Sequence, residues 1–114
     1  PLPRVIIIQL KRFTFDDSNN KIHTFVRYPL QNLNIGKYLA QTLSNQQQPK
    51  TIYNLIAVSM HTGSSLRSGH YTTYAKHSVT GAWHHFNDNS IELVRDKMSV
   101  ICDKAYVLVY LKRT

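Results

Sequence analysis

The chain has 114 residues, a length that suits one domain or a large part of one. No apolar run approaches the roughly 20 residues of a membrane-spanning helix, so we expect no membrane insertion. The formal net charge of +8 favours anionic partners, but the basic residues are scattered along the chain. No aromatic-interleaved basic motif accompanies them, so a nucleic-acid binder is the weaker alternative.

The first third of the chain predicts two paired strands. The run Val5–Leu10 is rich in β-branched residues and extends to Phe15, which predicts a strand buried on both faces near its start. After a turn cluster at Asp16–Asn20, apolar and polar residues alternate over Lys21–Tyr28. This alternation predicts a second strand that pairs with the first, and Pro29 ends it because proline has no amide donor.

The remainder predicts a series of strands joined by short turns. The segment around Leu33–Leu39 is expected to be short and helical or irregular, and the polar stretch Ser44–Lys50 to be an exposed loop. Together, the predicted elements indicate an α+β fold that is predominantly antiparallel β. The expected elements are strands at Thr51–Met60, His70–Lys76, Ala82–Asp88, Ile91–Val94 and Ala105–Leu111, a loop at His61–Gly69, a hairpin turn at Ser78–Gly81 and a helical turn at Arg95–Ser99.

His70 is singled out among the six histidines by its position. It stands where a glycine- and serine-rich loop ends and a strand begins. A general base needs a rigid backbone and an open approach for its substrate, and a strand end beside such a loop supplies both.

The expected hairpin also supplies a partner for His70. If the turn closes so that His77 faces Ala82, Asn87 lies opposite Thr72 and becomes a diagonal cross-strand neighbour of His70. Asp88 then points to the other face, although a register slip of one residue would exchange the two. The spacing therefore favours Asn87 as the residue that orients His70 and leaves Asp88 as a competitor. Alternatively, Phe86–Ser90 is only a turn at a strand end.

A metal site is not expected. His84 and His85 are adjacent and point to opposite faces of a strand, so they cannot chelate one ion together. His61 and His70 bracket one loop, but no further ligands are arranged beside them. Cys102 is the only cysteine, and its place before an apolar strand indicates a buried small hydrophobe rather than a nucleophile.

Together, five segments resemble the ubiquitin-specific protease family, in the family's order and spacing. Each segment alone is a weak signal, but the five cover nearly the whole chain. They are Leu2–Phe13 (LPRVIIIQLKRF), Tyr53–Val58 (YNLIAV), the histidine box at His61–Gly63 and Gly69–Tyr71 (HTG and GHY), Trp83–Asp88 (WHHFND) and Ala105–Tyr110 (AYVLVY).

The resemblance implies that residues 1–114 are the C-terminal, histidine-bearing palm portion of a papain-like cysteine peptidase with a thumb, palm and fingers. Such deubiquitinating enzymes cleave the isopeptide or peptide bond after the C-terminal glycine of ubiquitin. By position in the motifs, His70 matches the catalytic base and Asn87 the residue that orients it, with Asp88 as an assisting acid. Gly69, Tyr71 and His61 match substrate-binding positions near the ubiquitin tail, and Thr62–Ser68 matches a mobile loop that blocks it.

The nucleophilic cysteine of the family and the zinc-binding cysteines of its fingers have no match here. The resemblance therefore implies that this segment is inactive by itself. It implies no cofactor in this chain, and any structural zinc would belong to the fingers. The expected partners are ubiquitin, ubiquitinated proteins and the cysteine-bearing N-terminal part of the catalytic domain, in the cytoplasm and/or nucleus. The alternative is a catalytically inactive ubiquitin-binding or scaffold module.

Overall fold

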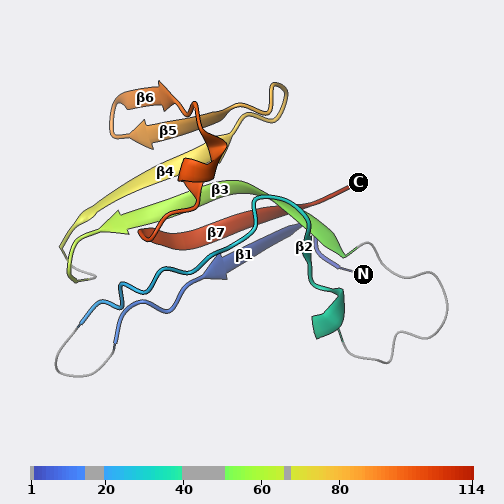
Figure 1. Ribbon diagram of the computed structural model, residues 1–114, viewed down its shortest axis with the longest axis horizontal. Coiled ribbons are helices and arrows are strands. Elements are labelled where there is room, and N and C mark those ends of the chain that lie inside the picture. The colour runs from blue at the N-terminus through green and yellow to red at the C-terminus, as the bar shows by residue number, and fades with distance from the viewer. Residues whose placement is uncertain (1, 15–19, 40–50, 66–67) are drawn as a thin grey trace.

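The computed structural model describes residues 2–14, 20–39, 51–65 and 68–114. They form a seven-stranded sheet with little helix, which confirms the predominantly antiparallel β fold (Figure 1). The strand order is β1-β7-β3-β4-β5-β6, and β2 pairs with β3 outside this path. The strands are β1 (Val5–Gln9), β2 (Leu33–Asn34), β3 (Ile52–Thr62), β4 (His70–Lys76), β5 (Trp83–Asn87), β6 (Ser90–Leu93) and β7 (Ala105–Lys112), and the two 3-10 helices are η1 (Gly36–Tyr38) and η2 (Lys97–Val100).

The predicted second strand is wrong. Only a single bridge, between Phe13 and Lys21, joins this region to the end of the first segment, and β1 pairs with β7 instead. The buried guanidinium of Arg12 explains the difference, because it donates hydrogen bonds to the backbone oxygens of Ile22 and Thr24. A side chain therefore occupies carbonyl groups that a strand ladder would have used.

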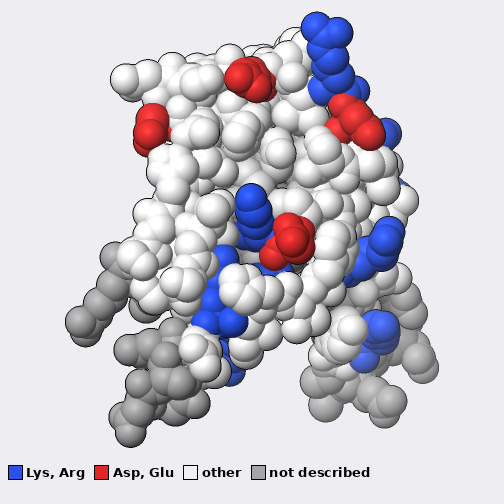
Figure 2. All heavy atoms as spheres, turned by 60° about the vertical axis from the view of Figure 1, so that its left-hand side comes forward, with Lys and Arg blue, Asp and Glu red and all other residues white. Residues whose placement is uncertain are grey.

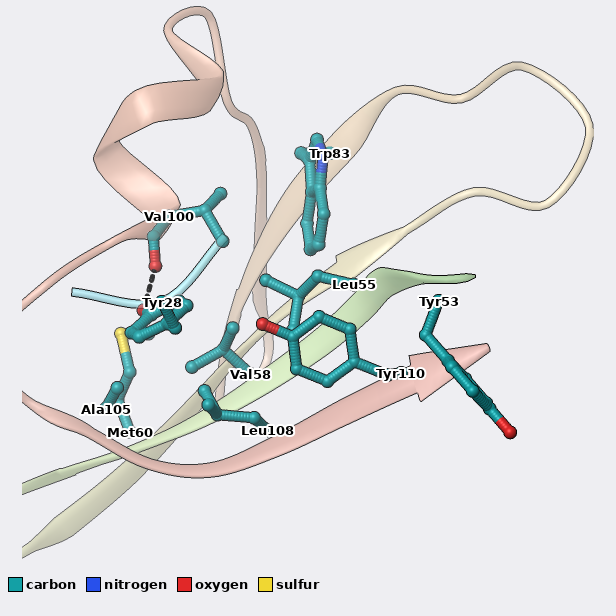
Figure 3. Packing of buried hydrophobic residues seen from close by; sticks show 10 residues of the cluster. All are labelled: Tyr28, Tyr53, Leu55, Val58, Met60, Trp83, Val100, Ala105, Leu108 and Tyr110. Carbon is teal, nitrogen blue, oxygen red and sulfur yellow. Dashed lines mark hydrogen bonds between the residues drawn. The ribbon is translucent and has the colours of Figure 1, made fainter. Parts of the chain in front are cut away.

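The segment of residues 20–32 crosses one side of the sheet, and η2 lies on the same side (Figure 1). Between these two segments and the sheet lies the hydrophobic core (Figure 3). The hydroxyl of Tyr28 joins the segments, because it donates to the backbone oxygen of Val100 over 2.5 Å and accepts from the backbone N–H of Cys102 over 3.1 Å. The buried hydrophobic residues are Tyr28, Tyr53, Leu55, Val58, Met60, Trp83, Val100, Ala105, Leu108 and Tyr110.

The expectation that the first strand is buried on both faces is also wrong. Val5 is 45% exposed and Ile7 is 68% exposed, whereas Ile6 and Ile8 pack against the core. Side chains alternate along a strand, and at β1 the described residues cover only one side of the sheet. The register places further exposed apolar side chains on the same open face, namely Leu111, Phe86, Ile91 and Leu93.

The second half of the chain follows the sequence prediction closely. β4 has the predicted bounds, and the predicted strands over Thr51–Met60 and Ala105–Leu111 correspond to β3 and β7 at the centre of the sheet. The short helical segment after Leu33 is η1, preceded by β2, and the expected loop at Ser44–Lys50 lies outside the described residues.

The register of the β4–β5 hairpin is also confirmed. The backbone N–H of His77 donates to the oxygen of Ala82 over 2.8 Å, and the pairs run from Lys76 and Trp83 to Thr73 and Phe86. This register brings the start of β4 beside the end of β5.

Candidate active site

His70 is the first residue of β4 and follows a glycine-containing loop. Its neighbour Gly69 has a φ of +139°, in the region that favours glycine. A Cβ atom on Gly69 would lie only 2.3 Å from the backbone oxygen of Thr62. Glycine is therefore required at this position, both for its backbone conformation and for the close approach of the two strand ends.

The amide of Asn87 is the nearest polar partner of His70. Nε2 of His70 lies 2.6 Å from Oδ1 of Asn87, which is the last residue of β5. An amide oxygen can only accept a hydrogen bond, so this contact requires the proton on Nε2. In the neutral ring, Nδ1 then carries a lone pair and is able to accept a proton.

The carboxylate of Asp88 is more distant from the same ring. Its Oδ2 atom lies 3.9 Å from Nε2 of His70, beyond hydrogen-bond distance. Asp88 stands in the two-residue turn between β5 and β6, with a φ of +51°. Its side chain is 79% exposed, compared with 47% for His70, so water screens the charge of Asp88. The structure thus brings all three predicted catalytic residues together, with Asn87 in direct contact.

The three predicted substrate-binding residues also lie together, but at different depths. Gly69 adjoins His70, and Tyr71 is 47% exposed. His61 is completely buried beneath them, with its ring centroid 4.8 Å from that of Tyr71. Burial, and after it the positive charge of Lys21, lowers the pKa of His61 below its ordinary value. Burial therefore disfavours the charged form of His61.

Two residues near this cluster were missed from the sequence. Nζ of Lys21 donates to the backbone oxygen of His61 over 2.8 Å, and the ring of Phe13 packs edge-on against the His61 ring. Both lie at least 40 residues from His61 in the chain, so no local motif relates them to the histidine box. Their proximity depends on the path of the chain around Arg12.

Further features of the described residues concern the predictions on metal binding, membrane insertion, basic charge and Cys102. No group of three or more His, Cys, Asp or Glu residues among them is placed to hold a metal ion, and they contain no helix long and apolar enough to cross a membrane. On the face that Figure 2 presents, Lys and Arg side chains occur at several places and acidic residues lie among them. Cys102 packs against the core but is half-buried, which is less burial than the sequence predicts.

Comparison with known proteins is consistent with this arrangement. Residues 1–110 match the sequence model of the family described as ubiquitin carboxyl-terminal hydrolase. The chain belongs to this family. It is 41% identical over 112 residues to human ubiquitin carboxyl-terminal hydrolase 3, a match that covers 97% of this chain and 21% of the human protein. It is 39% identical over 110 residues to ubiquitin carboxyl-terminal hydrolase 9 of Arabidopsis thaliana, covering 96% of this chain and 11% of that protein.

Solved structures show the same fold. The chain superposes on the SAGA Ubp8/Sgf11/Sus1/Sgf73 deubiquitinating module bound to ubiquitin aldehyde with a TM-score of 0.83 and 31% identity. That match covers 99% of this chain and 25% of the other chain. The chain thus spans about a quarter or less of the relatives that it matches here.

Proposed function

We propose that this chain is the histidine-bearing part of a deubiquitinating thiol protease, which hydrolyses the peptide or isopeptide bond after the C-terminal glycine of ubiquitin. The observation that carries the proposal is the contact between Nε2 of His70 and Oδ1 of Asn87. It provides an oriented general base at a strand end, within a chain of the ubiquitin carboxyl-terminal hydrolase family. The nucleophilic cysteine lies outside this chain in our proposal, because Cys102 packs against the core.

In the proposed mechanism, Nδ1 of His70 accepts the proton of the cysteine thiol. The thiolate attacks the carbonyl carbon of the ubiquitin C-terminal glycine, and the imidazolium then gives its proton to the leaving amine. Water, activated by the same nitrogen, hydrolyses the thioester and regenerates the thiol. Asn87 keeps the ring in the required orientation and tautomer through Nε2, and Asp88 adds a screened negative charge nearby.

The substrate side of the proposal assigns the ubiquitin tail to the surface beside His70. Gly69 has no side chain to obstruct an extended peptide, and Tyr71 presents a half-exposed ring next to it. Because His61 is buried, it acts on this surface from beneath Gly69 and Tyr71. Ubiquitinated proteins and the cysteine-bearing segment are the partners that this arrangement requires. One related module has been solved with ubiquitin aldehyde and another with monoubiquitin.

The experiment that tests the proposal locates the nucleophile. The polypeptide that carries this chain with its upstream segment is assayed for hydrolysis of a fluorogenic amide of the ubiquitin C-terminus, with and without prior alkylation by iodoacetamide. Cys102→Ala serves as the control variant. We expect turnover in the wild type and in Cys102→Ala, and loss of turnover in both after alkylation.

Two outcomes would contradict the proposal. Loss of turnover on Cys102→Ala, in a variant that still folds, would place the nucleophile in this chain. Ubiquitin binding without turnover in the wild type would instead identify an inactive ubiquitin-binding module.

A further inference from the structure

The imidazole of His61 is buried in a box of aromatic rings. Phe13 contacts it edge-on with a centroid distance of 5.3 Å, Tyr71 lies at 4.8 Å and Tyr106 at 6.4 Å. No hydrogen bond to either ring nitrogen of His61 meets ordinary geometric limits among the residues that the structure describes, although the backbone of Ser65 and of Ser68 lies near the ring and acts to raise its pKa. A polar ring without full hydrogen bonding is unfavourable in such a place. Burial of apolar surface therefore gives no reason for a histidine here, which leaves the size and shape of the ring.

The fourth side of the box is the backbone that leads into His70. A Cβ atom on Gly69 would lie 2.7 Å from Nε2 of His61 and 3.1 Å from its Cε1, so the Gly69 backbone rests on this edge of the ring. The strand pairing enforces this position, because Thr62 pairs with His70 and His61 pairs with Tyr71. The edge of the His61 ring thus limits how closely the backbone of Gly69, the residue before the proposed base, can approach.

The base of the loop leaves Gly69 little freedom to move away. A Cβ atom on Gly63 would lie 2.8 Å from the Cα atom of Gly69 and 2.8 Å from the backbone oxygen of Ser68. The His61 backbone is fixed as well, because its N–H donates to the oxygen of Lys104 and its oxygen accepts from Lys21. The ring is therefore a rigid support for Gly69.

We infer that His61 is a positioning residue for His70. Its compact five-membered ring holds the Gly69 backbone in the position that lets His70 contact Asn87. This inference rests on the proposed function for its catalytic consequence. A phenyl ring fills the same box but reaches further from the backbone than an imidazole does. At position 61 it would push Gly69 outward and carry His70 with it. Alanine would leave a cavity and risks failure to fold, so His61→Phe is the informative variant.

The test compares wild type, His61→Phe and His84→Phe in the polypeptide that carries the upstream segment. His84→Phe is the matched control, because alternation along β5 places His84 on the sheet face opposite His70 and Asn87. Steady-state hydrolysis of the ubiquitin amide is measured together with the melting temperature and the chemical shifts of the Asn87 side-chain amide, which reports its contact with His70. We expect His61→Phe to lower kcat by roughly 10- to 100-fold, since misplacement of a catalytic group by about 1 Å has this scale of effect. KM should change little, the melting temperature should fall by several degrees because the site is overpacked, and only His61→Phe should shift the Asn87 side-chain amide.

An unchanged kcat in His61→Phe would overturn the inference. So would a loss of activity that only follows a lower melting temperature, with the Asn87 side-chain amide unmoved, because this pattern means a structural role. If the wild type shows no turnover, the proposed function fails, but the amide shifts still decide the matter. Shifts confined to His61→Phe would support the positioning of His70, and their absence would contradict it.

Discussion

Nε2 of His70 and Oδ1 of Asn87 are 2.6 Å apart, although 17 residues separate them in the chain. The contact follows from one hairpin register, which places the end of β5 beside the start of β4. It fixes which ring nitrogen holds the proton and which is left to act as a base. Asp88, the next residue, lies 3.9 Å from the same nitrogen and is mostly exposed.

This difference in distance predicts unequal effects of substitution. Asn87→Ala should lower kcat/KM for ubiquitin amide hydrolysis by roughly 10- to 1000-fold, because the base loses its orienting partner and general acid–base catalysis is worth about 10²- to 10⁴-fold. Asp88→Ala should lower it by less than about tenfold, because an exposed pair separated by 3.9 Å is weak. Steady-state kinetics of both variants measure the two effects. A larger loss in Asp88→Ala than in Asn87→Ala would make the carboxylate the principal orienting group.

Substitution of Gly69 tests the close approach of the strand ends. Gly69→Ala should reduce turnover strongly, because its Cβ would meet the Thr62 oxygen and the His61 ring next to the proposed base. Gly81→Ala is the matched control. Gly81 also has a positive φ, of +76°, but the nearest atom to its Cβ would be Cε of Lys76 at 3.9 Å. The control should therefore lose only about 1 kcal/mol of stability and keep its activity. Equal activity of the two variants would show that the approach at Gly69 has no functional consequence.

Arg12 should matter for stability rather than for chemistry. Its buried guanidinium donates to the backbone oxygens of Ala105, Ile22 and Thr24. Arg12→Met leaves these acceptors without the side-chain donor and should lower the free energy of unfolding by about 2–4 kcal/mol. Urea denaturation measures this change, with the exposed Arg27→Met as a control expected to stay within about 0.5 kcal/mol. A loss below about 0.5 kcal/mol in Arg12→Met would mean that the three hydrogen bonds contribute little.

The buried His61 predicts a dependence of stability on pH. Burial, followed by the charge of Lys21, lowers the pKa of His61 in the folded chain from its ordinary value of 6.5. The unfolded chain therefore binds this proton more tightly, and the stability that neutral His61 permits is lost as the pH falls through 6.5 towards the lower, folded pKa. Melting temperatures recorded between about pH 7.5 and pH 5.5 should fall less steeply in His61→Phe than in wild type or His84→Phe. Equal slopes in all three proteins would contradict the prediction.

The part of the fold from β3 to β6 could be predicted from the sequence because each of these strands pairs with its neighbour in the chain. A short turn at Ser78–Gly81 fixes the β4–β5 register, and alternation along two strands then places Asn87 near His70. His70 and Asn87 could therefore be paired from the sequence without any knowledge of distant contacts. Their catalytic and substrate-binding roles, and those of Asp88, Gly69 and Tyr71, remain predictions.

In the first third, the sequence predicts the strand at Val5–Leu10 but not the path after it, because side-chain contacts and distant contacts decide that path. The alternating pattern at Lys21–Tyr28 is typical of a strand, but Arg12 takes its carbonyl groups and Tyr28 bonds to Val100 at the other end of the chain. Similarly, the apolar run at Val5–Leu10 does not reveal that one face of β1 stays open. The burial of His61 depends on Phe13 and Tyr106, which are far from it in sequence.

The central claim is that His70 is the base of a ubiquitin-cleaving thiol protease. The measurement that tests it most directly is hydrolysis of the fluorogenic ubiquitin amide by the polypeptide with its upstream segment, compared with His70→Ala. His77→Ala is the control, because His77 caps the turn at the opposite end of β4. We predict at least a 100-fold loss of kcat in His70→Ala, on the scale of general acid–base catalysis, and near-normal activity in His77→Ala. Turnover that survives in a folded His70→Ala variant would contradict the account.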